Sequence, residues 1–269
     1  MKLPNTILMC PPTHFKVDYE INPFMDKNNP IDEKLAFTQW TRLKEVYEDL
    51  GLNVKLIEPS PELPDMVFMA NQLVTLPNKR VLFSRMCHPQ RMPEVSLIID
   101  QIQPRDFFIS AETFEGTGDF IWDIFNGRCF LGHGKRTKKS AYEQFEEDLS
   151  SFECIYLNLI SDHYYHLDTC LCVIDENTCL FAEDAFDQDS IQKIKGSFHQ
   201  SIALNQTESL RFLACNAHSV DGKNIIVEQG AKITQGILEK LGKNIISINT
   251  SEFLKSGGSI FCLKNHAWF

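Results

Sequence analysis

The stretch LKSGGSIFCLKNHAWF, residues 254–269, places the pair Gly257–Gly258 shortly before Cys262, in what looks like a short apolar strand. A buried structural cysteine does not need glycines beside it, whereas a cysteine that backbone or substrate approaches closely does. Taken alone, Cys262 also fits a plain core thiol, because free cysteine is among the most buried residue types. The choice between these interpretations depends on the polar groups that the rest of the chain supplies.

The composition excludes several classes of protein. The chain has 269 residues, of which 43% are hydrophobic, and its net charge of −10 disfavours a nucleic-acid partner. No apolar run approaches the ~20 residues of a membrane span, and the N-terminus lacks the long apolar core of a secretory signal. Nine scattered cysteines without a CxxC pair indicate reduced thiols in a cytoplasmic protein, and they argue against a structural zinc site.

Short apolar runs typical of strands recur along the whole length, and helical patterns alternate with them at 32–51, 140–149 and 230–242. The first of these patterns is expected to bury one broad face that includes Leu35 and Phe37. No linker rich in Pro, Gly or Ser divides the chain, so we expect a single domain over 1–269. A doubly wound sheet is the simplest interpretation. However, no phosphate-binding glycine loop follows a strand, and the strands outnumber the helices.

Two stretches hold polar side chains where apolar ones are expected. In PDMVFMAN (64–71), Asp65 and Asn71 bracket an expected strand, and in FEGTGDF (114–120), Glu115 and Asp119 lie in a turn made flexible by glycine. Each of these acids also fits an ordinary turn residue. Glycines in such a turn, however, also allow a ligand to approach the backbone.

A third stretch, YYHLDTCLCVID (164–175), places His166 and Asp168 two residues apart, which puts both on one face if the segment is a strand. A buried His–Asp pair is often structural. Together with Cys262, however, these groups supply a thiol nucleophile, a histidine to move protons and acids to orient it, each from a distant segment. Such a set points to a hydrolase that attacks a carbon bearing nitrogens.

These motifs resemble the guanidine-modifying, or amidinotransferase, superfamily, which includes arginine deiminases, dimethylarginine dimethylaminohydrolases, glycine amidinotransferases and arginine dihydrolases. The resemblance runs from about residue 7 to residue 263 and is greatest to the arginine dihydrolases. The motifs that carry it are MCPPTHFKVDYEINPFM (9–25), PDMVFMAN (64–71), FEGTGDFIWD (114–123), GHGKRT (132–137), YYHLDTCLC (164–172) and SEFLKSGGSIFCL (251–263).

The resemblance implies a five-bladed α/β propeller, the pentein fold, with the active site in its central channel. It also implies that Cys262 is the nucleophile, that His166 is the acid and base, and that Glu115 is its partner acid. The substrate-binding residues implied for the guanidinium and amino-acid ends of the substrate are Asn22, Asp65, Asn71, Arg85, Arg91, Asp119, Arg136 and Asp168.

The implied activity is arginine dihydrolase, which yields ornithine, ammonia and carbon dioxide through a covalent intermediate and requires no metal or organic cofactor. The expected partner is a small molecule, arginine or a derivative, with no nucleic acid and no membrane, and a homo-oligomer is compatible with this. Alternatives within the superfamily are a dimethylarginine dimethylaminohydrolase, a simple deiminase or an amidinotransferase. Outside it, a propeller that binds ligands without catalysis remains an alternative.

Overall fold

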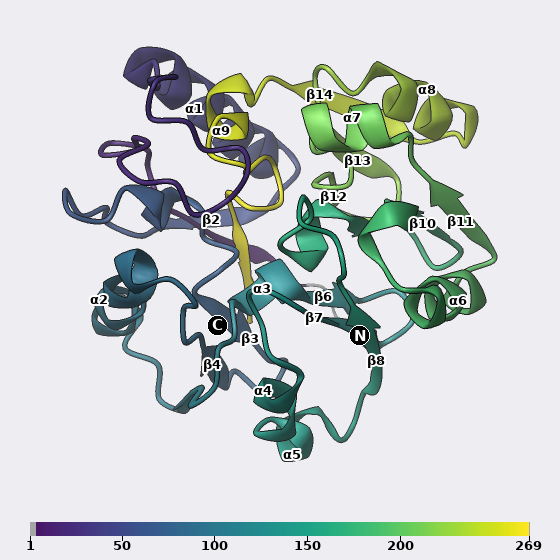
Figure 1. The fold of residues 1–269 in the computed structure, drawn as a ribbon, viewed down its shortest axis with the longest axis horizontal. Coiled ribbons are helices and arrows are strands. Elements are labelled where there is room, and N and C mark those ends of the chain that lie inside the picture. Colours follow the sequence, from purple (N-terminus) through teal and green to yellow (C-terminus); the bar gives the residue numbers. More distant parts are fainter. Residues whose placement is uncertain (1–3, 269) are drawn as a thin grey trace.

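The computed structural model describes residues 4–268, and its strands form five separate three-stranded sheets arranged around a common centre (Figure 1). Every sheet has the same topology: its first strand is antiparallel to the second, and the second is parallel to the third. Four sheets follow one another along the chain. They are β3–β4–β5 (Leu73–Thr75, Val81–Phe83, Phe107–Ile109), β6–β7–β8 (Phe120–Asp123, Arg128–His133, Glu153–Asn158), β9–β10–β11 (Leu171–Val173, Thr178–Phe181, Gln200–Ala203) and β12–β13–β14 (His218–Ser219, Asn224–Glu228, Asn244–Ile248).

The fifth sheet joins the two ends of the chain. Its first strand is β15 (Asn265–Ala267), which pairs antiparallel with β1 (Thr6–Met9), and β1 pairs parallel with β2 (Asn53–Leu56). The C-terminal strand therefore completes the module that the N-terminus begins. The expected five-bladed α/β propeller is confirmed.

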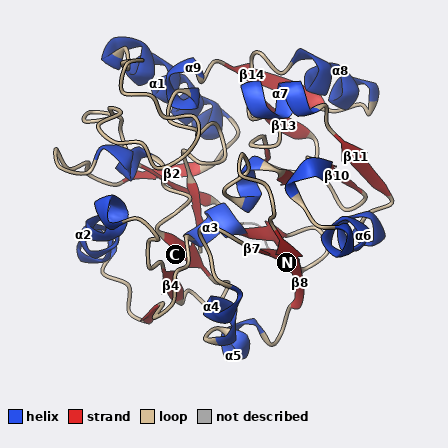
Figure 2. Cartoon of the chain, viewed as in Figure 1, coloured by secondary structure: helices blue, strands red, loops and turns tan. Residues whose placement is uncertain are grey.

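Helices form the outer ring of the molecule, and the sheets lie inside it (Figure 2). A parallel strand pair needs a crossover connection, and in each module a helix provides it between the second and third strands. These outer helices are α1 (Glu33–Asp49), α2 (Met92–Ile102), α4 (Lys139–Glu143) with α5 (Glu146–Leu149), α6 (Gln188–Ser197) and α8 (Lys232–Lys240). Three other short helices, α3 (Gly116–Asp119), α7 (Gln206–Arg211) and α9 (Ser251–Leu254), precede the first strands of their modules.

Helix α1 shows how these outer helices are fixed. The Asp32 side chain accepts a hydrogen bond from the backbone N–H of Leu35 and so caps the first turn. The helix then buries a stripe that includes Ala36, Trp40 and Leu43. The expectation that Leu35 and Phe37 also lie on the buried face is wrong, because they are 37% and 49% exposed. Each lies about 100° around the helix from Ala36, on either side of the stripe.

Several apolar runs that look like strands are not strands. The segments 259–263 and 212–216 are turns, 64–67 is a 3-10 turn, and His166 directly precedes another 3-10 turn at Leu167–Thr169. These segments lead into the first strands of their modules and are buried without pairing in a sheet. Among residues 4–268, no helix is long and apolar enough to cross a membrane, and all nine cysteines are free thiols.

Candidate active site

One polar residue from each module lies just before that module's first strand. They are Asn71 before β3, Asp119 before β6, Asp168 before β9, Asn216 before β12 and Cys262 before β15, and all five are buried. The repeated topology therefore brings these five loops together at one end of the inner strands. A cavity opens beside them, and its walls are Ile21, Asn22, Met25, Asp65, Phe68, Asn71, Arg91, Arg136, Tyr165, His166, Ser256, Gly258 and Cys262.

The glycine pair before Cys262 has a different purpose from the one expected. Gly257 has a φ of +82°, which side-chain-bearing residues rarely adopt. A Cβ on Gly258 would lie 2.2 Å from the ring of Phe68, and one on Gly257 would lie 2.6 Å from the hydroxyl of Tyr165. The glycines thus make room for two aromatic side chains of the cavity wall, and the turn that they form sets the position of Cys262.

The thiol of Cys262 has two polar neighbours. Its Sγ lies 3.2 Å from Oδ2 of Asp168 and 3.1 Å from Nδ2 of Asn216. The Asn216 side chain also accepts hydrogen bonds from the backbone N–H groups of Phe261 and Cys262, at 3.0 and 3.2 Å. Asn216 therefore holds both the backbone and the sulfur of this turn.

Burial, and next the negative charge of Asp168, raise the pKa of the Cys262 thiol well above its usual range. Burial also raises the pKa of Asp168 to about 7, although the Cys262 thiol, the Lys264 charge and Asn216 act against the shift. With no cation beside it, the thiol is therefore protonated at neutral pH, and it donates to Asp168. A positive charge in the cavity would favour the thiolate.

His166 and Glu115 form the second chemical unit. Nε2 of His166 lies 2.6 Å from Oε2 of Glu115, which also accepts a hydrogen bond of 2.9 Å from Arg136. The other oxygen of Glu115 accepts the backbone N–H of Cys87 at 2.8 Å. Burial alone would raise the pKa of Glu115, but the charge of Arg136 and the bond to His166 outweigh it and hold that pKa well below its usual range. Glu115 is therefore a carboxylate, and Nε2 of His166 carries a proton toward it.

The remaining ring nitrogen of His166 faces Asn71. Nδ1 lies 3.4 Å from Nδ2 of the Asn71 amide, whereas Oδ1 of that amide accepts a hydrogen bond of 2.8 Å from Arg91. Arginine can only donate, so this contact fixes which side of the amide is oxygen. Arg91 is itself held by both oxygens of Glu94, each at 2.9 Å. The NH₂ group of Asn71 and the Nδ1 lone pair of His166 thus lie together at the cavity.

Asp119 lies behind the cavity wall. Its oxygens accept hydrogen bonds from Thr137 (2.7 Å) and from the backbone N–H of Leu167 (3.0 Å), and Oδ2 lies 4.0 Å from Nε2 of His166. Burial raises the pKa of Asp119 to about 6, against the opposing effects of His166 and Thr137. Glu115, with its closer contact of 2.6 Å, is therefore the acid that orients His166.

The predicted substrate-binding residues divide into two groups. Arg91, Arg136, Asn22 and Asp65 all line the cavity, together with Asn71. Asn22 donates to the carbonyl of Ser256 at 3.0 Å, and one oxygen of Asp65 accepts from Tyr19 at 2.9 Å. Its other oxygen, Oδ1, is buried and has no hydrogen-bond partner among the described residues.

Three of the predicted residues, Arg85, Asp119 and Asp168, are not part of the cavity wall. Arg85 is exposed, whereas Asp119 and Asp168 are buried behind the wall, where they bind the backbone next to His166 and the Cys262 thiol, respectively. The structure also brings in residues that sequence reasoning missed. Asn216 lies within an apolar run and carries no motif, whereas the i, i+3 spacing of Arg91 and Glu94 is a readable signal for an ion pair on a helical turn. Within residues 4–268, no three His, Cys, Asp or Glu side chains gather closely enough to hold a metal ion.

The fold and this set of buried polar groups define a pentein, a member of the guanidine-modifying (amidinotransferase) superfamily. Within that superfamily, residues 10–266 match the family described as eukaryotic N,N-dimethylarginine dimethylhydrolase, and the chain belongs to this family. The N(G),N(G)-dimethylarginine dimethylaminohydrolase of Mycobacterium tuberculosis is 32% identical over 256 residues, which are 94% of this chain and 83% of that protein.

The chain is similar to a second kind of protein to almost the same degree. The bifunctional arginine dihydrolase/ornithine cyclodeaminase ArgZ of Synechocystis is 31% identical over 264 residues, which are 96% of this chain but only 37% of ArgZ. The fold also matches a crystal structure of the N-terminal domain of ArgZ, in which an asparagine-to-serine variant is covalently bonded to a reaction intermediate. This match has a TM-score of 0.89 and 30% sequence identity, and it covers 98% of this chain and 97% of that domain. The protein is accordingly a guanidine-modifying hydrolase of the pentein type.

Proposed function

We propose that this chain is an arginine dihydrolase, which converts arginine and two waters to ornithine, carbon dioxide and two molecules of ammonia, with Cys262 as its nucleophile. The observation that carries the proposal is the meeting of Cys262, His166 and Asn71 on the wall of one cavity. Asp65 on the same wall, with one free carboxylate oxygen, suits a cationic guanidinium. The likeness to the ArgZ domain with a covalently bonded intermediate supports covalent catalysis.

The substrate itself would activate the nucleophile. Burial and Asp168 keep Cys262 as a thiol when no cation lies beside it, so a neutral molecule meets a weak nucleophile. A guanidinium beside the sulfur adds the positive charge that favours the thiolate. The thiolate then attacks the guanidinium carbon and forms a tetrahedral adduct, and Asn216 keeps the sulfur in place through its contact of 3.1 Å.

His166 would transfer the protons through Nδ1, because its Nε2 is bound to Glu115. In this mechanism the Nδ1 lone pair first takes the proton that the Cys262 thiol loses when the thiolate forms. Nδ1 then passes this proton to the leaving nitrogen, the C–N bond breaks, and ammonia departs from a thiouronium intermediate. Water then enters, Nδ1 accepts its proton, and the C–S bond breaks to release a ureido group, which at this stage is citrulline. The charge of Glu115 stabilises the imidazolium that forms in each transfer.

Asn71 favours the dihydrolase over a deiminase that stops at citrulline. The ureido carbon carries no positive charge, so a second attack needs a donor at its oxygen. Because Arg91 occupies the amide oxygen of Asn71 at 2.8 Å, the amide NH₂ is turned toward the cavity. An amide at this place can stabilise the developing oxyanion, whereas a carboxylate cannot.

A second candidate is hydrolysis of dimethylarginine to citrulline and dimethylamine, which the family match over residues 10–266 favours. The deciding experiment incubates the full chain with arginine labelled with ¹³C at the guanidino carbon, with asymmetric dimethylarginine and with agmatine, and identifies the products by mass spectrometry. The dihydrolase releases the label as carbon dioxide, whereas a deiminase retains it in citrulline. Release of dimethylamine with little turnover of arginine would replace the proposal with the second candidate. Cys262→Ser protein provides the blank.

The roles of Arg91 and Arg136 are tested by agmatine, which lacks the carboxylate of arginine. If these guanidiniums hold that carboxylate, agmatine is a poor substrate of the wild type. Both arginines already bind buried acids, Glu94 and Glu115, so the substrate carboxylate would share them with these partners. Efficient turnover of agmatine would show that Arg91 and Arg136 do not bind the substrate carboxylate and only hold Glu94 and Glu115 in place.

A further inference from the structure

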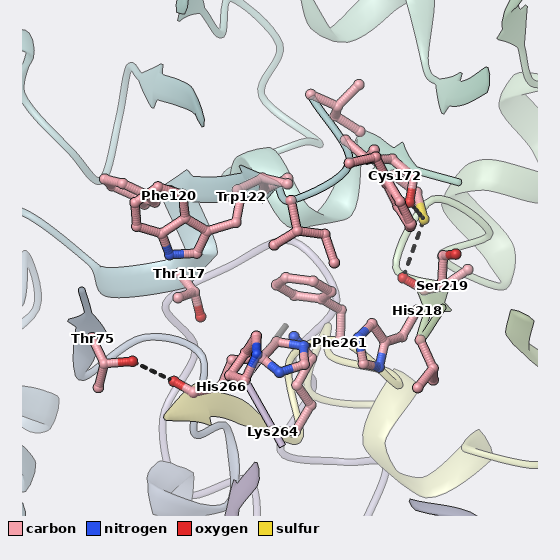
Figure 3. Close-up of a pocket in the computed structure, with 18 of the residues that line it drawn as sticks. Thr75, Thr117, Phe120, Trp122, Cys172, His218, Ser219, Phe261, Lys264 and His266 are labelled. Atoms are coloured by element: carbon pink, nitrogen blue, oxygen red, sulfur yellow. Dashed lines mark hydrogen bonds between the residues drawn. The ribbon is translucent and has the colours of Figure 1, made fainter. Parts of the chain in front are cut away.

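A second cavity lies on the other side of the segment that carries Cys262. Phe261, Lys264 and His266 line this second cavity, whereas Cys262 lines the first, so one short segment separates the two. The second cavity has a volume of about 50 Å³ and opens to solvent at its mouth. Figure 3 shows Phe120 and Trp122 of β6 facing His218, His266 and Lys264 across it. Its wall is largely aromatic and aliphatic.

Three nitrogen atoms of the residues that line this cavity have no hydrogen-bond partner in the described part of the chain. Nζ of Lys264, Nε1 of Trp122 and Nδ1 of His266 are buried, and none of them makes a hydrogen bond within residues 4–268. Lys264 is fully buried, and its Nζ lies 3.2 Å from the centre of the Phe261 ring, within cation–π distance. Buried polar groups are normally hydrogen-bonded, so several unpaired groups on one cavity wall indicate a ligand that would pair with them.

The charges around the cavity select the kind of ligand. No Asp or Glu is among the residues that line it, so Lys264 faces no carboxylate across the space. Burial lowers the pKa of Lys264 to about 7, and the charge of Asp168, the first of the groups that oppose this shift, only partly compensates it. An anion in the cavity would therefore hold Lys264 in its charged form, whereas a cation would be repelled.

We propose that this second cavity binds a small monocarboxylate with an apolar body, its carboxylate paired with Lys264 and its body against Phe120, Trp122 and Phe261. The site is separate from the cavity of Cys262, and the proposal does not depend on which guanidino compound that cavity takes. Its ligand class is distinct as well, because the first cavity presents two arginines, whereas the second presents one lysine within an aromatic enclosure.

The test uses benzoate and its neutral isostere benzamide, titrated into the full chain by isothermal calorimetry. Benzoate is expected to bind at least tenfold more tightly than benzamide, because a charge-assisted contact with a buried ammonium distinguishes the two. Lys264→Met keeps an unbranched side chain, one atom shorter, and removes its charge. This change should weaken the binding of benzoate by about 10- to 100-fold and leave the binding of benzamide unchanged. Replacement of an unpaired buried ammonium by an apolar chain is not expected to unfold the protein.

Two controls locate the binding. Arg136→Met removes a cation from the first cavity and should leave the affinity for benzoate unchanged, as should Lys240→Met, which alters an exposed lysine. Trp122→Phe changes the aromatic wall of the second cavity and leaves the charge of Lys264 in place, so it should weaken the binding of benzoate and of benzamide to the same extent. The proposal is overturned if benzoate binds no more tightly than benzamide, if Lys264→Met binds it as well as wild type does, or if Arg136→Met alone abolishes binding.

Discussion

Replacement of Asn71 by Asp tests how the second hydrolytic step is made. The change keeps the size of the side chain and replaces the NH₂ donor by an oxygen acceptor with negative charge. Arg91 donates to Oδ1 at 2.8 Å and would keep that oxygen in the variant. The second oxygen would then take the place of Nδ2, which lies 3.4 Å from Nδ1 of His166 at the cavity. The new charge is thus placed where the ureido oxygen of citrulline is expected.

The size of the effect follows from this geometry. Loss of one oxyanion donor costs about 3 kcal/mol, or about two orders of magnitude in rate. Repulsion between the new carboxylate and an oxyanion ~4 Å away, at an effective dielectric of ~20, adds a cost of the same order. The first step acts on a cation, which the carboxylate attracts, so it should slow by less than tenfold. Wild type is therefore expected to make ornithine, whereas Asn71→Asp accumulates citrulline.

The assay is a quenched time course with labelled arginine, from which the ratio of citrulline to ornithine is measured by mass spectrometry. Asn22→Asp is the matched control, since it adds the same charge to the same cavity beside Ser256 and should alter KM but not the product ratio. If Asn71→Asp makes ornithine in the wild-type proportion, the amide does not stabilise the second step and the reasoning fails. If wild type itself stops at citrulline, the dihydrolase proposal fails.

Three further predictions concern the same site. Cys262→Ser should reduce turnover at least a thousandfold with an unchanged melting temperature, measured by ammonia release and calorimetry, and activity near wild type would make Cys262 structural. Gly118→Ala should cost about 1–3 kcal/mol of stability and shift the products toward citrulline, because its Cβ would lie 2.5 Å from Nδ2 of Asn71 and 3.3 Å from the His166 ring. Burial raises the pKa of Asp168 to about 7, so the folded state keeps a proton that the unfolded state loses near pH 4. The free energy of unfolding therefore falls as the pH rises from about 4 to about 7. Asp168→Asn should remove that part of the slope in denaturant titrations from pH 4.5 to 8, and an identical slope would contradict the assignment.

The sequence pattern predicted most of the strands and helices but not their arrangement, because its simplest interpretation was a doubly wound sheet. The resemblance to the superfamily implied the five-bladed propeller that the five sheets form. Alternating apolar runs located most of the strands, and the helical periodicity of 32–51, 140–149 and 230–242 matches α1, α4 with α5, and α8. Periodicity, however, reports burial rather than sheet pairing. The apolar runs at 212–216 and 259–263 are therefore indistinguishable from strands in sequence, although both are buried turns.

The sequence predicts some residues of the candidate site and gives no sign of others. Cys262, His166 and Glu115 come together as expected, because each belongs to a motif with its own spacing. Asn216 could not be predicted, since a single amide in an apolar run becomes informative only when the fold brings it to within 3.1 Å of the sulfur. Lys264 gave no signal either, because a lysine next to an apolar run is normally solvated, whereas this one is fully buried.

The electrostatics of the site explain why a second hydrolysis is the harder part of the proposed reaction. Burial raises the pKa of Asp65, Asp119 and Asp168 and, with Asp168, that of the Cys262 thiol, so these four groups resist ionisation unless a cation lies beside them. A guanidinium relieves this by supplying the missing positive charge, which favours the thiolate and the carboxylates together. Citrulline brings no such charge. An enzyme that retains it for a second attack must therefore replace the lost cation with fixed donors, and the oriented amide of Asn71, held by Arg91 beside His166, is the donor that the cavity offers.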